Sequence, residues 1–249
     1  LIKSVTQPYA SFGGSPEETS LQYYTRVSER IRHRNRAINQ WDYEHLILQQ
    51  FKDIYKVKSL NHTKDDNYHA AGEVALVVIP DIVNNNAFDI YQPRVSTAKR
   101  NEIQQYVNGL NSFFVEAEVI NPDYEEIKIT TGVRFRTGYD ENYYTGILET
   151  AIKKYLSPWA FSETNDLNFG ITFHRSKIIQ YLEQLEYVDY LEDVEVAHRK
   201  GPTAAYEIKT NVVPSSPKAI LVSAKQHKVY AIGAKCESPT TKTKTKCLP

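Results

Sequence analysis

The sequence predicts an α+β fold, with an N-terminal αα-hairpin followed by ferredoxin-like strand-helix-strand units and a C-terminal β-hairpin. Three observations lead to this class. Two helix-start signals, each followed by apolar residues at helical spacing, open the chain. Strand-like and helix-like segments then alternate through its middle. Two short apolar runs flank a polar turn near its end.

The N-terminal hairpin follows an extended entry. Ser15, Pro16 and Glu18 have the spacing of a capped helix start, with the serine as N-cap and the glutamate three residues later. The apolar residues of this helix, which runs to about residue 34, are Leu21, Tyr24, Val27 and Ile31. Asn39 followed by Asp42 predicts a second helix start, and the apolar residues after it are Tyr43, Leu46, Ile47 and Phe51.

The middle of the chain alternates between the two kinds of segment. Residues 73–79 contain a continuous apolar run that ends at Pro80, which is typical of a central strand. Gly132 predicts a bulge in a long strand, and Asp140 predicts the cap of the helix that follows. The predicted elements are strands 54–60 and 73–79, helix 93–110, strands 113–120 and 125–136, helix 140–156, strand 170–173, helix 176–185 and strand 188–197.

The chain changes character after Arg199, where prolines and polar residues dominate. Residues 219–223 and 229–232 predict a terminal hairpin that turns at Lys225 and Gln226. The predicted divisions are 1–62 (entry, αα-hairpin and first strand), 72–199 (ferredoxin-like α+β domain), 200–235 (linker and terminal β-hairpin) and 236–249 (flexible tail).

Composition excludes several functional classes. Thirty basic residues balance thirty acidic ones, so no overall charge attracts the protein to nucleic acid or anionic lipid. No apolar run is long enough to span a bilayer, and no signal peptide is visible, so no membrane association is expected. The chain contains no methionine and begins with Leu1, and we expect it to be the C-terminal part of a longer protein. Its eighteen tyrosines favour an interface role.

No pattern in the sequence indicates catalysis. The seven histidines are scattered, with no pair at metal-binding helical spacing. The only cysteines, Cys236 and Cys247, lie in the tail and form no metal or redox motif. The acidic residues at the helix starts are explained by capping. The sequence therefore predicts a protein that is not an enzyme and needs no cofactor or metal.

The densest chemical feature is a basic cluster at the end of the first predicted helix. Three interpretations apply: a protein-protein joint, a nucleic-acid patch, or a solvated face. Nearby acidic residues that could pair with the arginines, and the balanced charge, favour the joint, with Trp41 as an anchor of the hairpin. The suspected interface residues are Arg26, Arg30, Arg32, His33, Arg34, Arg36, Trp41, Asp42, Tyr43, Glu44 and Trp159.

Several of these segments resemble the C-terminal region of baseplate J-like proteins, in particular their Bacteroidetes-type versions. The N-terminal segments that carry the resemblance are 8–14 (PYASFGG), 26–38 (RVSERIRHRNRAI), 41–44 (WDYE), 55–58 (YKVK) and 61–63 (NHT). Those that follow are 121–125 (NPDYE), 138–140 (GYD), 156–161 (LSPWAF) and 220–224 (ILVSA). The resemblance covers nearly the whole chain except its Thr/Lys-rich tail.

This resemblance implies a structural subunit. Baseplate J-like proteins are wedge components of contractile phage tails and of tail-like injection systems, and they link the central hub to the sheath. The implied partners are other wedge subunits, as a homodimer or heterodimer within a sixfold ring, together with sheath and hub proteins. The implied location is a phage virion or tail-like particle assembled in the bacterial cytoplasm. A nucleic-acid-binding accessory protein that uses residues 30–36 is the alternative. A third possibility is an isolated carbohydrate- or peptide-binding module that uses the tyrosines.

Overall fold

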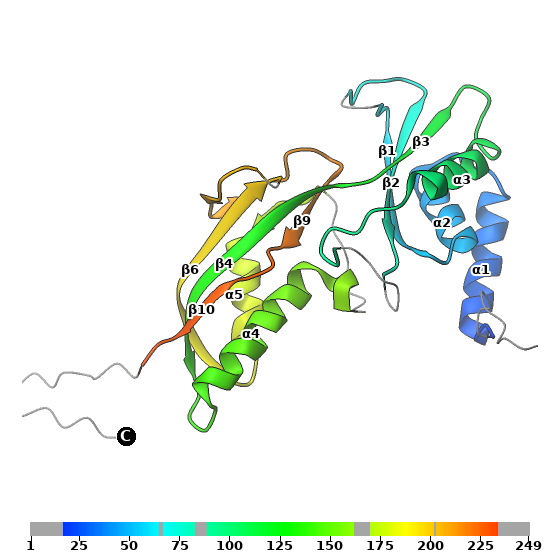
Figure 1. The fold of residues 1–249 in the computed structure, drawn as a ribbon. Coiled ribbons are helices and arrows are strands. Elements are labelled where there is room, and N and C mark those ends of the chain that lie inside the picture. The colour runs from blue at the N-terminus through cyan, green and yellow to red at the C-terminus, as the bar shows by residue number, and fades with distance from the viewer. Residues whose placement is uncertain (1–16, 65–66, 83–88, 162–169, 202, 234–249) are drawn as a thin grey trace, which may run out of the picture.

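The computed structural model describes residues 17–64, 67–82, 89–161, 170–201 and 203–233, which form two lobes arranged end to end (Figure 1). Each lobe is a sheet with helices packed on it, which confirms the predicted α+β class. The helices are α1 (Ser20–His33), α2 (Gln40–Gln50), α3 (Thr97–Asn108), α4 (Glu141–Leu156), η1 (Pro158–Phe161) and α5 (Arg175–Glu183). The strands are β1 (Ile54–Asn61), β2 (Glu73–Pro80), β3 (Glu116–Ile120), β4 (Asp123–Phe135), β5 (Phe173–His174), β6 (Val188–Lys200), β7 (Glu207–Ile208), β8 (Asn211–Val212), β9 (Ala219–Ser223) and β10 (Lys228–Ala231).

The first lobe is built on a three-stranded sheet in the order β1-β2-β3. Strand β2 is central, antiparallel to β1 and parallel to β3, and every residue from Val74 to Ile79 is buried. This confirms the prediction from its continuous apolar run. Helices α2 and α3 supply the other half of the core, with Leu46 and Ile47 from α2 and Ile103 from α3 almost fully buried against the sheet.

The second lobe is organised around β4. Strand β6 pairs with β4 antiparallel on one side, and β7 extends the sheet beyond β6. Helices α4 and α5 bring Leu148, Ile152, Ile178 and Leu182 into the core of this lobe. The β4–β6 register is irregular between Thr130 and Gly132, as the bulge prediction required. The side chain of Ile232 comes so close to Gly132 that a Cβ there would collide with it.

The predicted C-terminal hairpin is wrong. Strands β9 and β10 do not pair with each other, because both run parallel to β4 along the same edge, one after the other. The polar residues between them bend the chain without reversing it. His227 fills the gap in the ladder: its Nδ1 accepts the backbone N–H of Ile129 at 3.0 Å, the β4 group that lies between the two paired stretches. Burial lowers the pKa of His227 to about 4, consistent with a neutral ring that accepts this bond.

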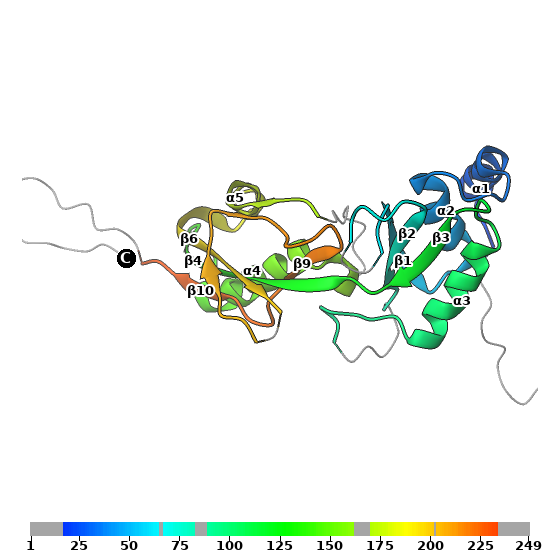
Figure 2. The same cartoon turned by 90° about the horizontal axis from the view of Figure 1, so that it is seen from above.

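The lobes are joined by chain continuity and by a shared apolar cluster. Strand β3 passes directly into β4, so one ribbon runs through both sheets (Figure 2). The cluster combines Ile79 of β2 with Tyr124 of β4, Trp159 of η1, and Ile220 and Val222 of β9. Two hydrogen bonds to the segment before α3 complete it: the Trp159 Nε1 donates to Ile90 O at 3.1 Å, and the Tyr124 hydroxyl donates to Pro93 O at 2.5 Å. Burial raises the pKa of Tyr124.

The sheets divide the chain differently from the predicted ranges. Strand β1, assigned to 1–62, shares its sheet with β2 and β3, which were assigned to 72–199, whereas β4 and β6 belong to the other lobe. The predicted ferredoxin-like units are thus distributed over two sheets. Strand pairing, rather than the loop at about residue 62, determines which segments pack together. The predicted tail, 236–249, lies outside the described residues, as do Ser15 and Pro16.

The start of α1 also differs from the prediction. Residues 17–19 are not helical, and the N-cap is Thr19. Its hydroxyl accepts the Gln22 N–H at 3.3 Å, while the Gln22 side chain accepts the Thr19 N–H at 2.9 Å. This reciprocal capping box satisfies two of the free donors at the helix start. Glu18, which was predicted to form a capping box with Ser15, forms an ion pair with Arg26 instead.

Candidate assembly interface

Helix α1 lies on the outside of the first lobe (Figure 1). Three of the four residues of its predicted apolar stripe are exposed to solvent, and Val27 is half-buried. Leu21 is 77% exposed, Tyr24 68% and Ile31 67%. Among the residues of α1 only His33 is buried. The αα-hairpin predicted from this stripe therefore has no apolar seam between its two helices, although both helices form.

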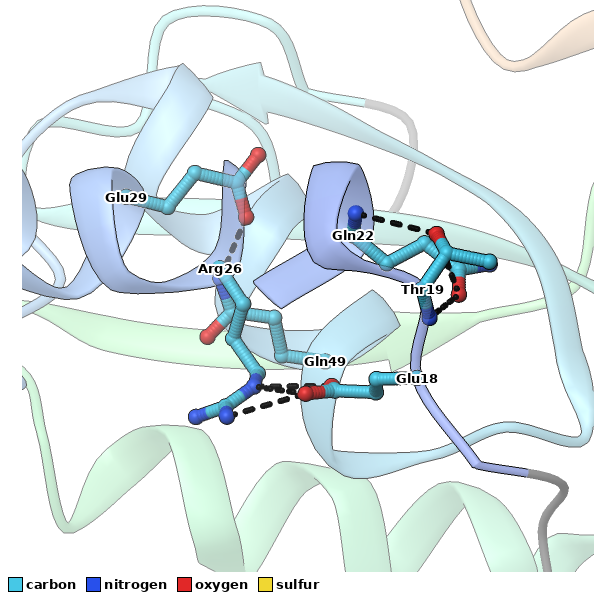
Figure 3. Close-up of polar contacts among 6 residues, drawn as sticks. All are labelled: Glu18, Thr19, Gln22, Arg26, Glu29 and Gln49. Carbon is cyan, nitrogen blue, oxygen red and sulfur yellow. Dashed lines mark hydrogen bonds and ion pairs between the residues drawn. The ribbon is translucent and has the colours of Figure 1, made fainter. Parts of the chain in front are cut away.

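Polar contacts attach α1 to α2 instead (Figure 3). Glu29 Oε1 lies 2.8 Å from His45 Nδ1, and Glu29 Oε2 accepts a hydrogen bond from the Gln49 amide. Arg26 of α1 donates two hydrogen bonds to the carboxylate of Glu18, which precedes the helix: from Nε at 2.8 Å and from Nη2 at 3.0 Å. This hydrogen-bonded pairing lowers the pKa of Glu18 and raises that of Arg26. Exposed contacts of this kind fix orientation and contribute little stability.

Trp41 is stacked between the two helices. The guanidinium carbon of Arg32 lies 4.0 Å from the centre of the Trp41 ring, and the His45 ring stacks on Trp41 with centroids 3.9 Å apart. A cation over an indole face is among the more favourable cation–π geometries. Trp41 is only half-buried, so it links α1 to α2 by stacking rather than by core burial.

The chain turns sharply after α1. Arg34 and Asn35 have left-handed backbone conformations, with φ of 51° and 54°, and the buried His33 Nδ1 accepts the Asn35 N–H at 3.0 Å. This turn leaves the side chains of Arg34 and Arg36 exposed, like that of Arg30 on the last turn of the helix. Within the residues that the structure describes, these three arginines form no ion pair.

Four of the suspected interface residues serve the fold itself. The Asp42 carboxylate accepts the N–H groups of Ile38 at 3.2 Å and Asn39 at 3.1 Å, which caps α2. Tyr43 is 3% exposed in the first core, and burial raises its pKa. Glu44 accepts the Ser59 N–H at 3.0 Å and ties α2 to β1. Trp159, in the cluster between the lobes, is 1% exposed.

The sequence prediction missed two strongly exposed residues beside the arginines. Phe113 is 98% exposed and Phe114 89%, because β3 begins at Glu116 and not at Phe113 as predicted. The adjacency of two phenylalanines was an available signal, since neighbouring strand residues point to opposite faces and both cannot enter one core. Their rings pack edge to face with centroids 6.2 Å apart.

Backbone pairing brings this loop alongside the turn after α1. The Ala37 N–H donates to Leu110 O at 3.0 Å, and Ala37 forms a parallel bridge with Asn111. Ile38, next to Ala37, is 69% exposed. The exposed residues in and next to these paired segments are here called the basic–aromatic end: Arg30, Arg34, Arg36, Ile38, Phe113 and Phe114. Clustered exposed apolar side chains with arginines are typical of surfaces that bind other proteins.

Two features are absent from the described residues. They contain no group of three or more histidine, cysteine, aspartate or glutamate side chains placed to hold a metal ion. They also include no helix of the length and hydropathy needed to cross a bilayer. Ser223 Oγ and His227 Nε2 form a hydroxyl–imidazole pair at 2.9 Å that is buried, and His227 already accepts a backbone N–H through its other nitrogen.

The fold and this surface define a class: a two-lobed α+β protein with exposed basic and aromatic residues at one end. The family model of the PVC11-like baseplate proteins matches residues 1–222, and the chain belongs to that family. Among solved structures, a chain of the cryo-EM structure of the anti-feeding prophage baseplate, 6-fold symmetrised, has the same fold, with a TM-score of 0.65 and 19% identity. The match covers 85% of this chain and 43% of the anti-feeding prophage chain, so this chain spans less than half the length of the anti-feeding prophage chain. No curated protein sequence matches.

Proposed function

We propose that this chain is a structural wedge subunit of the baseplate of a contractile tail-like particle, and that the basic–aromatic end is one of its joints. The main observation that supports this joint is the exposure of Phe113 and Phe114, at 98% and 89%. The three arginines of the same end form no ion pair within the described part of the chain. Membership of a baseplate family supports the assembly context. The role is mechanical and not enzymatic.

The partners proposed are other wedge subunits within the baseplate ring, and through them hub and sheath proteins. The finer resemblance to J-like wedge proteins belongs to this proposal, as does assembly in the bacterial cytoplasm. In such a joint the phenylalanines supply desolvated contact area, and the arginines set register by pairing with carboxylates of the neighbour. The two lobes, joined through the Trp159 cluster, carry load between neighbouring subunits.

The experiment uses sheathed particles purified from the source organism, with the full-length protein carrying either Phe113→Ser and Phe114→Ser together or no change. Quantitative mass spectrometry of intact particles measures incorporation. The control is Ile208→Ser, since Ile208 is an exposed apolar residue too, at 67%, but lies on β7 in the other lobe. We expect stoichiometric wild-type and control protein, and at least a tenfold loss for the double variant.

The outcomes separate the two parts of the proposal. Absence of the wild-type protein from intact particles would refute the baseplate role. Normal incorporation of the double phenylalanine variant would leave that role intact and remove the basic–aromatic end as a joint. The nucleic-acid alternative is tested separately by a gel-shift titration with arbitrary duplex DNA, where binding that weakens steeply with salt would support it.

A further inference from the structure

The outer face of α1 has a regular pattern that the basic–aromatic end does not use. Leu21, Tyr24, Ser28 and Ile31 follow one another at spacings of three, four and three residues, the pattern of a coiled-coil seam. All four are exposed. The opposite side of the helix carries Glu29, which contacts His45 of α2, together with Arg26 and His33, which contact the segments that flank α1. Arg32, near the end of α1, stacks on Trp41 of α2.

A helix in this position lacks the usual source of its stability. Isolated helices shorter than about 12–15 residues are marginal in water, and most helices in proteins are stabilised by burying an apolar face. Helix α1 has 14 residues, yet the apolar residues of its seam lie in solvent. One residue of the seam has a neighbouring ring: the rings of Tyr24 and Tyr23 pack edge to face at 5.7 Å, and Arg26 lies 5.5 Å from the centre of the Tyr23 ring.

The seam is complementary to itself when a second copy lies antiparallel. In that arrangement Leu21 of each copy meets Ile31 of the other, and Tyr24 meets the small Ser28. Large residues thus face either apolar or small ones in every layer, as knobs-into-holes packing requires. A twofold axis through the midpoint of the seam generates both halves of this contact, which is the geometry of an isologous dimer.

The charges along α1 agree with the same orientation. The entry to the helix is acidic, with Glu17 and Glu18, and the far end carries Arg30, Arg32 and Arg34. Antiparallel pairing places Glu17 of one copy alongside the turn that follows α1 in the other. Parallel pairing would instead place arginines beside arginines, which is unfavourable.

We propose that the outer face of α1 binds the same face of a second copy of this chain, antiparallel, through Leu21, Tyr24, Ser28 and Ile31. The contact is a short one, so it is weak in isolation and is reinforced where copies are held together by other joints. The pairing is a property of the chain alone. Its failure would leave the baseplate role standing, and failure of the baseplate role would leave the pairing standing.

Association is measured by sedimentation equilibrium of the full chain over a concentration series reaching about 1 mM, in a background carrying Cys236→Ser and Cys247→Ser. The variants are Leu21→Glu and Ile31→Glu, with Ile208→Glu as the control of equal exposure to Ile31. We expect reversible dimers for the wild type and the control, and dissociation constants at least tenfold higher for the two seam variants. A monomer at all concentrations, or dimers that are insensitive to both seam changes, would overturn the proposal.

Orientation is measured by disulfide trapping in the same background. Two single variants, Tyr24→Cys and Ser28→Cys, are mixed and oxidised, and the bridged peptides are identified by mass. Antiparallel pairing puts residue 24 opposite residue 28, so mixed disulfides between the two variants should predominate. If the bridges join 24 to 24 and 28 to 28 instead, the helices are parallel and the proposed contact is wrong.

Discussion

Replacing Trp159 with alanine should destabilise the protein far more than the same change at Trp41. Trp159 is 1% exposed at the junction of the lobes, and its indole N–H satisfies Ile90 O. Truncating a buried tryptophan costs about 3–5 kcal/mol, and the abandoned carbonyl adds about 1 kcal/mol. Trp41 is half-buried and held by stacking, so we expect about 1 kcal/mol for Trp41→Ala.

The assay is equilibrium unfolding in urea, followed by circular dichroism for every variant. The chain contains only these two tryptophans, so each variant retains one fluorescent reporter: Trp41 in the first lobe, or Trp159 between the lobes. In Trp159→Ala, we expect the Trp41 signal to report a transition at clearly lower urea concentration. A loss below about 1.5 kcal/mol for Trp159→Ala, or a larger loss at Trp41 than at Trp159, would refute the assignment of Trp159 as the inter-lobe anchor.

Three further predictions concern other parts of the chain. The unfolded chain protonates His227 near pH 6.5 and the folded chain only near pH 4, so stability should fall by about 3 kcal/mol between those values and level off below. In thermal melts at a series of pH values, the Tm of His227→Gln should change less between pH 6.5 and pH 4 than the Tm of the wild type. Asp42→Ala should cost about 1–3 kcal/mol, because two backbone N–H groups lose their acceptor, as urea unfolding will measure. The double serine variant of Phe113 and Phe114 should change thermal stability by less than about 0.5 kcal/mol, since both rings are exposed.

Local patterns in the sequence predicted most of the helices and the long strands. The apolar run of β2 and the Asp140 cap of α4 depend on interactions within a few residues, and both appear as predicted. The start of α1 shows the limit of this reasoning. Ser15–Glu18 and Thr19–Gln22 are competing capping signals in the same segment, and sequence alone does not rank them.

Strand pairing could not be predicted in the same way. Apolar runs at 219–223 and 229–232 are compatible with a hairpin or with two strands along one edge, and the choice depends on β4, about a hundred residues earlier in the chain. The decisive contact, from the Ile129 N–H to the His227 ring, joins residues with no local relation. The same long-range control explains why strand β1 shares a sheet with β2 and β3.

The suspected interface residues are divided between the surface and the core. The arginines of the basic cluster are exposed as an interface requires, but Asp42, Tyr43 and Trp159 are buried within the chain. Acidic and aromatic residues at a helix start have the same pattern whether they cap, fill a core or bind a partner. The sequence predicts a strand that begins at Phe113, because aromatic residues favour strands. The exposure of Phe113 and Phe114 depends on the surrounding structure, which the local sequence does not specify.

The central claim is that this chain is a baseplate subunit with a joint at the basic–aromatic end. A cryo-EM map of the baseplate in native sheathed particles tests it most directly. We expect density for both lobes in the baseplate ring. Phe113 and Phe114 should be buried against a neighbouring subunit, and carboxylates should face Arg34 and Arg36. A baseplate fully accounted for without this chain, or one in which that end faces solvent, would contradict it.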